Sequence, residues 1–320
     1  MYNTYLYMGR ILVAGGAGFI GSHLCDALLA QGHEVICVDN FITGSETNIK
    51  HLMGNPQFTL LKKDISKDEI EIEGLTHIFN LASPASPADF EKIPEEIALT
   101  NSLGTLKLLS LVVKTKARFV ITSTSEVYGD PKEHPQKETY WGNVNSFGPR
   151  SCYDESKRFA ETLIYIYLKK FGIDARIARI FNTYGPRMRK EDGRAVSNFI
   201  NQALEGKPLT VYGTGEATRS FCFVSDLVDG LMALMFTEGI SGEIFNLGNP
   251  EEYTILAFAE KIKGITGCES NIEFSQSPVD DPQMRKPDIS KAKEKLRWEP
   301  KVNVDEGLSK TVEYYRSLNS

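Results

Sequence analysis

Apolar stretches of strand length alternate with stretches of helical period through the first 180 residues of the chain. Short runs rich in β-branched and aromatic residues predict strands, and helical periodicity predicts the helices between them. The predicted strands span 11–14, 34–39, 58–61, 77–81, 119–123 and 175–180, and the predicted helices span 19–31, 97–116 and 153–171. This alternation predicts an α/β fold, a Rossmann-like doubly wound parallel sheet with helices on both faces.

The pattern changes after residue 180, where Gly and Pro become frequent and the helical stretches become short. The later helices are predicted at 196–204, 226–236, 254–265, 290–296 and 305–317. We predict a first domain over residues 1–180, to which 220–250 returns, and a smaller C-terminal α/β substrate-binding region over 181–320. Ligands of such sheets bind at the carboxyl ends of the strands.

A glycine-rich segment joins the first predicted strand to the first predicted helix. A tight turn at Gly15, Gly18 and Gly21 needs positive φ, and a pyrophosphate reaches backbone N–H groups only where no Cβ intrudes. Asp39 ends the second strand, where a carboxylate accepts hydrogen bonds from the adenosine ribose and repels a 2′-phosphate. The segment therefore predicts a dinucleotide site that takes NAD rather than NADP, placed in the domain over 1–180.

Residues that follow the other strands are expected to line the same site. The stretch after Asp39 continues around the adenosine, the end of the third strand meets the adenine, and the end of the fourth runs under the cofactor. These further cofactor residues are Phe19, Ile20, Asn40, Phe41, Thr43, Gly44, Asp64, Ile65, Leu81, Ala82, Ser83 and Thr100.

Tyr153 and Lys157 are separated by four positions on a predicted helix, so they share one helical face. A free tyrosine, with a pKa near 10, is a poor base at neutral pH, and a nearby ammonium favours the phenolate. Lowering the pKa by about three units requires roughly 4 kcal/mol, supplied by Lys157 and a positively charged nicotinamide ring. The spacing predicts a proton-transfer pair beside the dinucleotide.

A polar segment, Thr124-Ser125-Glu126, ends the fifth predicted strand. With the glycine loop and the Tyr-x-x-x-Lys pair, it resembles the extended short-chain dehydrogenase/reductase superfamily of nucleotide-sugar enzymes over essentially the whole chain. The resemblance implies that Tyr153 takes the proton of the sugar 4-hydroxyl while C4 gives hydride to NAD⁺. It also implies that Lys157 favours the phenolate of Tyr153 and that Thr124 shares the hydrogen bond to the 4-hydroxyl.

The same segment distinguishes branches of that superfamily. Sugar 4,6-dehydratases carry an acid where this chain has Ser125, and 4-epimerases usually lack a glutamate at the position of Glu126. Thr124-Ser125-Glu126 resembles the UDP-glucuronate decarboxylases, as do longer stretches at 82–87, 129–131, 148–153, 179–188 and 280–288. If the chain were a non-catalytic dinucleotide-binding protein, a damaged set of catalytic residues would be expected, whereas Tyr153, Lys157 and Thr124 are all present.

This resemblance implies NAD-dependent conversion of UDP-glucuronate to UDP-xylose and CO2. The steps are C4 oxidation, loss of CO2 from the 4-keto acid, C5 protonation and C4 re-reduction by the NADH that the enzyme retains. It further implies that Glu126 and Arg219 act around the carboxylate or the C5 protonation, with their individual roles open. A UDP-sugar 4-epimerase, or another enzyme that forms a 4-keto sugar, is the alternative.

Basic residues cluster at 187–194 although the chain as a whole is acidic, which suits a substrate with a diphosphate and a carboxylate. By resemblance Arg285 meets the diphosphate, Asp288 the uridine ribose, and 209–212 covers the uracil. Arg189 and Lys190 are expected on the exposed surface. The expected substrate residues are Pro84, Ser86, Arg150, Asn182, Arg187, Arg194, Thr210, Tyr212, Arg219, Arg285 and Asp288.

Charge and composition bear on nucleic-acid binding, on the state of the cysteines and on metal sites. A formal net charge of −6 argues against non-specific nucleic-acid binding. The five cysteines are scattered without a CxxC pair, which predicts buried free thiols, and the five histidines show no spacing typical of a metal site. Trp141 and Trp298 are interpreted as packing residues.

The N-terminal segment 1–8 is polar and tyrosine-rich, and no run of about 18 apolar residues occurs. We therefore expect no secretory signal, no membrane span, and a cytoplasmic, soluble protein. Relatives in the resembled family dimerise through two helices per subunit in a four-helix bundle. The corresponding helices here are 97–116 and 153–171, so a homodimer is expected.

Overall fold

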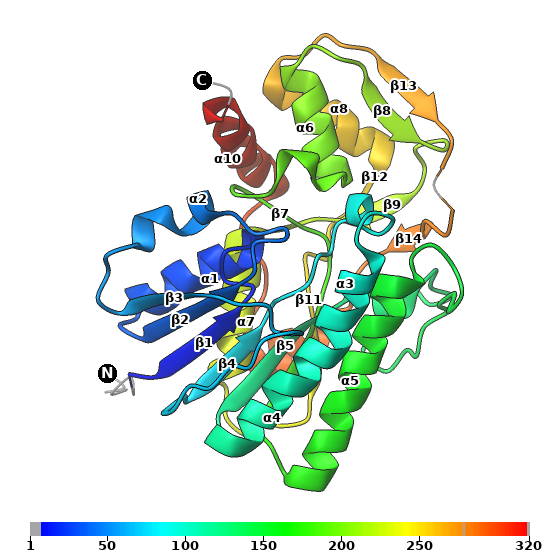
Figure 1. Cartoon of the computed structure of the whole chain (residues 1–320). Helices are drawn as coiled ribbons and strands as arrows, with labels where there is room; N and C mark the ends of the chain where they lie inside the picture. The colour runs from blue at the N-terminus through cyan, green and yellow to red at the C-terminus, as the bar shows by residue number, and fades with distance from the viewer. Residues whose placement is uncertain (1–7, 278, 319–320) are drawn as a thin grey trace.

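The computed structural model describes residues 8–277 and 279–318. Its centre is a parallel sheet with seven strands in the order β11–β6–β5–β4–β1–β2–β3 (Figure 1). These strands are β1 (Arg10–Ala14), β2 (Glu34–Asp39), β3 (Phe58–Lys62), β4 (His77–Asn80), β5 (Arg118–Thr124), β6 (Ala175–Ile180) and β11 (Ile244–Leu247). The order reverses between β1 and β4, as in a doubly wound dinucleotide-binding sheet. The predicted fold class is confirmed.

Each strand of the sheet contributes to two separate hydrophobic cores, because successive side chains point to opposite faces. In β1, Ile11 and Val13 pack into one core, and Leu12 and Ala14 pack into the other. The first core contains α1 and α7, whereas the second contains α4 and α5 (Figure 1). The helices around the sheet are α1 (Phe19–Ala30), α2 (Glu46–Ile49), α3 (Pro94–Leu99), α4 (Thr105–Thr115), α5 (Ser151–Phe171) and α7 (Val224–Phe236).

The predicted helix over 97–116 is divided in the structure by a π-helical turn, Thr100–Gly104, between α3 and α4. Gly104, the last residue of the turn, packs closely against the loop that follows β3. A Cβ on Gly104 would lie 2.7 Å from Cγ1 of Ile65 in that loop. The prediction of one continuous α-helix is therefore wrong. A π turn keeps the chain helical and leaves the apolar spacing helix-like, so the sequence pattern does not reveal it.

One helical stretch of the described residues, Pro94–Thr115, has the length and composition of a membrane-spanning helix, with a mean hydropathy of 1.3. Half of its most apolar part is buried inside the protein, and core helices of soluble proteins can have the same length and composition. The stretch is therefore weak evidence of a membrane segment. The predicted absence of a secretory signal rests on 1–8, of which 1–7 lie outside the described residues.

In the described residues the C-terminal half adds three small sheets and four further helices, three of which lie above the carboxyl ends of the main strands (Figure 1); the fourth, Ser290–Leu296, packs against β11 and α7. Strands β12, β9 and β14 form one sheet, β8 pairs with β13 in another, and β7 pairs with β10. The strands are β7 (Thr183–Tyr184), β8 (Leu209–Tyr212), β9 (Thr218–Ser220), β10 (Cys222–Phe223), β12 (Glu252–Thr254), β13 (Ile272–Ser275) and β14 (Met284–Arg285). The helices are α6 (Ala195–Leu204), α8 (Ile255–Thr266), α9 (Ser290–Leu296) and α10 (Val304–Ser317).

Two predictions about single residue types have different outcomes. All five cysteines are free; Cys25, Cys37 and Cys222 are buried, whereas the other two are only half-buried. Trp298 packs as predicted, is 5% exposed and donates its indole N–H to a backbone carbonyl. Trp141 is 88% exposed, so its interpretation as a packing residue is wrong.

Candidate active site

A cavity of about 520 Å³ lies between the carboxyl ends of the main strands and the C-terminal region. A smaller cavity of about 60 Å³ adjoins it and shares the glycine loop. We call them the large and the small cavity. Figure 1 shows that the elements around them come from both halves of the chain.

Most predicted site residues line one of these cavities. Those in the large cavity are Gly15, Gly18, Phe19, Ile20, Gly21, Thr43, Leu81, Ser83, Ser86, Thr124, Ser125, Glu126, Arg150, Tyr153, Lys157, Asn182, Arg187, Arg194, Thr210, Tyr212, Arg219 and Arg285. Those that line the small cavity without lining the large one are Asp39, Asn40, Gly44, Asp64, Ile65, Ala82, Pro84 and Thr100.

Phe41 and Asp288 line neither cavity. Phe41 has positive φ (62°), and its backbone N–H donates to Oδ1 of Asp39 at 2.8 Å. The Oδ1 atom of Asp288 accepts a 2.8 Å hydrogen bond from the backbone N–H of Ser290. Both residues therefore make local backbone contacts and do not line the cavities, and their contact with cofactor or substrate stays a prediction.

The glycine loop between β1 and α1 has little space for side chains. Only Gly15 of the three predicted glycines has positive φ (78°), so the expectation of positive φ throughout the turn is too broad. A Cβ on Gly15 would lie 2.7 Å from the backbone nitrogen of Ala82, and one on Gly21 would lie 2.0 Å from the carbonyl oxygen of Gly15. No side chain caps α1, so the N–H groups of its first turn are available to an anion.

Asp39 lies at the end of β2 and is 7% exposed. Its Oδ2 atom accepts from the backbone N–H of Ala17 at 2.9 Å, which ties the carboxylate to the glycine loop. Gly44 leaves room for it, because a Cβ there would lie 2.8 Å from Oδ1. The carboxylate is thus fixed at the small cavity, beside the loop that would hold a pyrophosphate.

Helix α5 brings Tyr153 and Lys157 to the end of β5. The Nζ atom of Lys157 donates to the backbone carbonyl of Thr122 at 2.8 Å and lies 5.8 Å from the centre of the Tyr153 ring. The ring of Phe90 stacks on that of Tyr153, with 5.3 Å between centroids. Both members of the pair are almost fully buried, and Thr124 lies within hydrogen-bonding reach of the phenol.

Burial governs the acidity of this pair. It raises the pKa of Tyr153 to about 12, although the hydrogen bond with Thr124 acts in the opposite direction. Burial also lowers the pKa of Lys157 to about 7, against the attraction of Glu161. The expected lowering of the tyrosine pKa depends on Lys157 together with a positively charged nicotinamide ring, so it stays a prediction; among the protein groups, desolvation has the largest effect.

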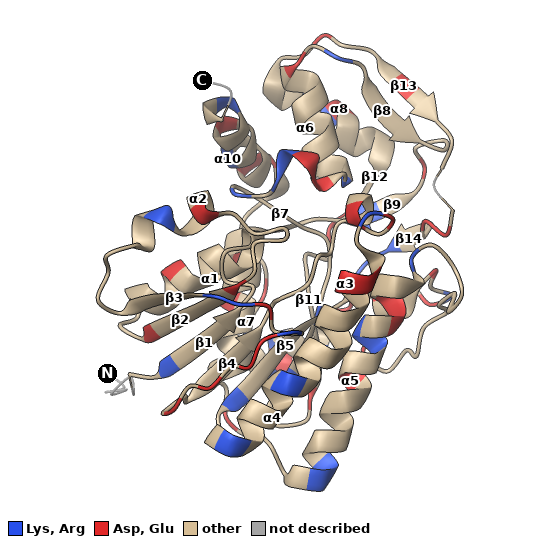
Figure 2. Ribbon diagram, in the orientation of Figure 1, with Lys and Arg blue, Asp and Glu red and all other residues tan. Residues whose placement is uncertain are grey.

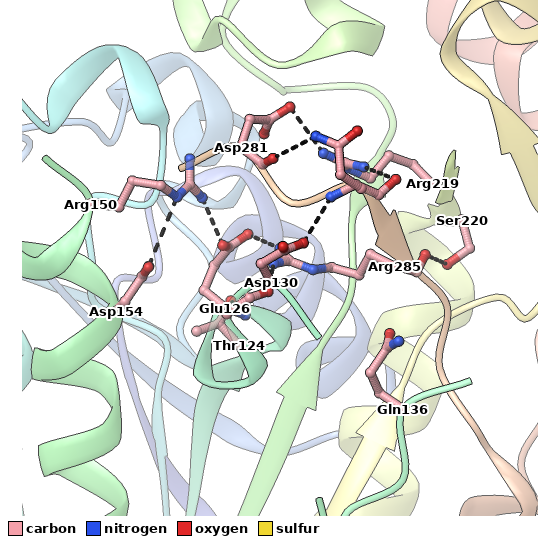
Figure 3. A network of polar contacts seen from close by, with 12 residues as sticks. Thr124, Glu126, Asp130, Gln136, Arg150, Asp154, Arg219, Ser220, Asp281 and Arg285 are labelled. Carbon is pink, nitrogen blue, oxygen red and sulfur yellow. Dashed lines mark hydrogen bonds and ion pairs between the residues drawn. The ribbon is translucent and has the colours of Figure 1, made fainter. Parts of the chain in front are cut away.

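Glu126 lies in a cluster of charged side chains (Figure 3) and lines the same cavity as Tyr153 and Lys157. It forms an ion pair with Nη1 of Arg285 and accepts from Nη2 of Arg150 at 2.7 Å. Arg285 also donates to the backbone carbonyl of Gly129 at 2.9 Å. Burial acts to raise the pKa of Glu126, but the charges of Arg285 and Arg150 hold it at about 2, so the side chain is ionised.

The other predicted cationic residues also have acidic partners. Arg219 pairs with Asp281 at 3.1 Å, and Arg187 pairs with Asp26 of α1 at 2.8 Å. Arg194 pairs with Asp192. Figure 2 shows basic and acidic residues side by side in the segment before α6. The cavity wall at 187–194 is therefore partly neutralised rather than simply cationic.

Arg189 was expected on the exposed surface, with Lys190. Arg189 instead pairs with Asp89 and lines the large cavity, and both basic residues are half-buried. The expectation is wrong because the turn at Lys190–Asp192 lies against the turn at Pro87–Asp89.

Comparisons with known proteins identify the family. A family model described as the NAD-dependent epimerase/dehydratase family matches residues 11–248. UDP-glucuronic acid decarboxylase 1 of Arabidopsis thaliana is 54% identical over 96% of this chain and 70% of its own length. UDP-glucuronic acid decarboxylase 1 of Xenopus tropicalis is also 54% identical, over 96% of this chain and 72% of its own. This chain belongs to the UDP-glucuronic acid decarboxylase branch of the NAD-dependent epimerase/dehydratase family.

A solved relative of this decarboxylase branch supports the fold. UDP-glucuronic acid 4-epimerase from Bacillus cereus, in complex with UDP-glucuronic acid and NAD, superimposes with a TM-score of 0.88. Its sequence is 33% identical, over 96% of this chain and 99% of that one. The epimerase shares the fold with the decarboxylases, so the chemistry must be decided by particular side chains.

The glycine loop of this family member fits NAD. Added Cβ atoms at Gly15 and Gly21 would collide with backbone, while the uncapped start of α1 offers N–H groups to a pyrophosphate. Asp39 offers a carboxylate to the adenosine ribose and would repel a 2′-phosphate. NAD is the cofactor of the family, and these residues have the chemistry to hold it.

Replacing Gly21 with alanine is expected to weaken NAD binding by at least about tenfold and to lower the melting temperature. The new Cβ would lie 2.0 Å from the carbonyl oxygen of Gly15, so the loop must move away from the geometry that receives the pyrophosphate. Fluorescence titration with NAD measures the effect. Gly264→Ala is the control, because no atom lies within 4 Å of a Cβ at that position; equal binding by both variants contradicts the assignment of the loop.

Several residues of the site were missed by sequence reasoning. Phe90 stacks on Tyr153, and Asp281 pairs with Arg219, but neither position has a local signal that connects it to its partner. Asp154 could have been found, since it directly follows Tyr153 and stands four positions after Arg150. That spacing places a carboxylate and a guanidinium on one helical face.

Proposed function

We propose that this chain decarboxylates UDP-glucuronate to UDP-xylose and CO2 in the large cavity. The observation that carries the proposal is the ionised Glu126, which is held by two arginines beside Tyr153 and Thr124. A sugar with C4 near the phenol brings its C5 substituent toward this cluster. The 54% identity to UDP-glucuronic acid decarboxylases supports the same activity.

Tyr153 acts first, as the base that takes the proton of the sugar 4-hydroxyl. Its pKa of about 12 means that the phenolate needs further positive charge, which charged Lys157 and the cofactor provide together. The glycine loop and Asp39 would hold NAD, which would supply the acceptor for the C4 hydride and its store for re-reduction, so no outside oxidant would be consumed. Thr124 also hydrogen-bonds to the sugar 4-hydroxyl and holds it in position for proton transfer to Tyr153.

The ketone formed at C4 makes the neighbouring carboxylate labile. As the C5–carboxylate bond breaks, its electron pair forms an enolate whose oxygen carries the charge at C4. Tyr153 and Thr124 stabilise this oxygen by donating hydrogen bonds where charge develops. Their burial strengthens the interaction, because water does not compete for the oxygen.

Glu126 acts as a carboxylate in this scheme, since a group with a pKa of about 2 does not donate a proton at neutral pH. It can repel the substrate carboxylate or orient the water that protonates C5; both roles need the charge. Arg285 holds Glu126 and is nearly fully buried, so we assign it to this cluster and not to the diphosphate. Arg219 lies across the cavity with Asp281.

The C-terminal region supplies the walls for the nucleotide half of the substrate. Thr210 and Tyr212 of β8 line the large cavity, with Asn182 after β6 and Arg194 before α6. We propose that uracil lies against β8 and the diphosphate near the two polar residues. In this scheme residues 1–180, with 220–250, bind NAD, and 181–320 mainly bind the UDP-sugar.

The proposed reaction is tested with UDP-glucuronate labelled with ¹³C at the carboxylate. Release of the label as bicarbonate or CO2, matched by UDP-xylose, is the expected result. Retention of the label in UDP-galacturonate would instead identify a 4-epimerase, whose solved relatives share this fold. The heat-inactivated protein is the control for uncatalysed loss of label.

We also propose that the protein is a homodimer that pairs through α4 and α5 in a four-helix bundle. Apolar side chains remain on the outer side of these helices: Phe159 is 49% exposed and Ile166 is 44% exposed on α5, and Val113 is 36% exposed on α4. Phe159 and Ile166 are seven positions apart and share a helical face.

No membrane partner is needed for this arrangement, and we propose a cytoplasmic location.

Light scattering at micromolar concentration is expected to give twice the chain mass of 35.7 kDa. Ile166→Arg should shift the protein to monomers, because it places an unpaired charge in an apolar interface. Phe274→Arg is the matched control, since Phe274 is 59% exposed on β13, away from this face. A wild-type monomer, or an Ile166→Arg dimer, contradicts the proposed interface.

A further inference from the structure

Asp154 is a buried carboxylate that the proposed mechanism does not use. It lies on α5 directly after Tyr153, with its side chain only 7% exposed. Its Oδ2 atom is 3.9 Å from Nε of Arg150, a contact drawn as a dashed line in Figure 3. Its Oδ1 atom is buried without a hydrogen-bond partner. A buried carboxylate oxygen without a partner is costly when it is ionised.

Arg150 is shared between two carboxylates. Its Nη2 atom donates to Glu126 at 2.7 Å, whereas its contact with Asp154 is the longer one. Glu126 is also held by Arg285, so it is the better-compensated anion of the two. The geometry therefore assigns the negative charge to Glu126 and leaves Asp154 as the group that can be neutralised.

The charged groups around Asp154 support this division. Burial first, and then the negative charge of Glu126, raise its pKa to about 7, against the attraction of Arg150 and Arg285. Glu155, on the same helix, acts in the raising direction. Tyr153, Cys152 and Arg150 in turn feel the charge of Asp154. Asp154 is thus poised to change its charge in the neutral range.

We infer that Asp154 is a positioning residue that takes up a proton when the carboxylated sugar binds and releases it after the carboxylate has left. This inference rests on the proposed placement of the substrate carboxylate beside Glu126. A further negative charge in the cluster favours the neutral form of Asp154. Neutral Asp154 no longer competes for Arg150, so the guanidinium pairs with Glu126 alone during decarboxylation.

The proton of this cycle comes from solvent and returns to solvent. Asp154 does not line the cavity, so it acts through Arg150 and does not hand its proton to C5. Loss of CO2 removes the extra negative charge, and the pKa of Asp154 falls back. The carboxyl group therefore adjusts the charge of the cluster to the substrate that occupies it.

Proton uptake on binding tests the inference by titration calorimetry in two buffers of different ionisation enthalpy. The NAD-loaded Tyr153→Phe variant is used so that turnover is slowed by about 10³-fold during the titration. UDP-xylose, which has the same diphosphate and no carboxylate, measures the uptake by other groups of the site, such as Lys157 with its pKa of about 7. UDP-glucuronate is expected to bind with uptake of roughly half a proton per site more than UDP-xylose at a pH just above 7.

Adding Asp154→Asn to that background should abolish the difference in uptake between the two sugars while UDP-glucuronate still binds. Glu155→Gln, at the adjacent position, is the matched control and should retain it. If Asp154→Asn does not fold, as judged by circular dichroism, Asp154→Ala replaces it. A difference in uptake between the two sugars that persists without the Asp154 carboxyl, or equal uptake with both sugars in its presence, overturns the inference. Failure of UDP-glucuronate to bind at all is a different result, because it overturns the proposed function on which the inference rests.

Discussion

Replacing Tyr153 with phenylalanine is expected to lower kcat by about 10³-fold, with a KM for UDP-glucuronate that stays within a few-fold of the wild-type value. A positioned acid–base group typically contributes 10²- to 10⁴-fold. Here it also stabilises the C4 oxygen, so both oxidation and loss of CO2 should suffer. The ring remains stacked on Phe90, which preserves the shape of the site.

The measurement is steady-state turnover with UDP-glucuronate, together with formation of reduced cofactor in a single turnover. Both should fall together, because the hydroxyl proton can no longer be removed. Tyr165→Phe on the same helix is the control; Tyr165 is 62% exposed and should tolerate the loss of its hydroxyl. A Tyr153→Phe enzyme that keeps a tenth of the wild-type kcat would remove the phenol from the mechanism.

Replacing Glu126 with glutamine is expected to lower CO2 release by about 10²-fold, while the first hydride transfer continues. The side chain keeps its size but loses the charge that both proposed roles require. It also leaves Arg285 and Arg150 without their anion, so correct folding must be checked by circular dichroism. Reduced cofactor and the 4-keto acid should therefore accumulate in a single turnover.

This result separates Glu126 from Tyr153, because only the glutamine variant is expected to oxidise C4. The near-ultraviolet absorbance of the reduced cofactor and the yield of CO2 are followed in the same sample. Glu273→Gln, an exposed position on β13, is the control for the substitution itself. Wild-type release of CO2 by Glu126→Gln contradicts any role for the ionised side chain.

Much of the fold was predictable, because strands and helices in the first 180 residues follow the periods that burial imposes. Strand β5 alternates between two cores, and the predicted strand 119–123 lies within the observed Arg118–Thr124. The π turn at Thr100–Gly104 was not predictable, since it preserves the helical spacing of apolar residues. The short strands of the C-terminal half carry too few residues to show a period.

The candidate site was predictable where residues are close together in sequence. The glycine loop and the Tyr153–Lys157 pair depend on local spacing alone. The partners of the arginines did not follow in that way, because Arg285 and Glu126 are 159 positions apart and meet only through the fold. The effect of burial on the pKa of Tyr153 was not predictable either, since the sequence does not reveal how far the site excludes water.

The most direct test of the account is proton NMR of the purified protein with UDP-glucuronate and catalytic NAD⁺ in D2O. We predict that UDP-xylose forms with one deuterium at C5 and that no NADH accumulates beyond the enzyme concentration. This outcome requires decarboxylation, protonation from solvent and an internal hydride cycle in one site. UDP-galacturonate as the product, with its carboxylate retained, would contradict the account.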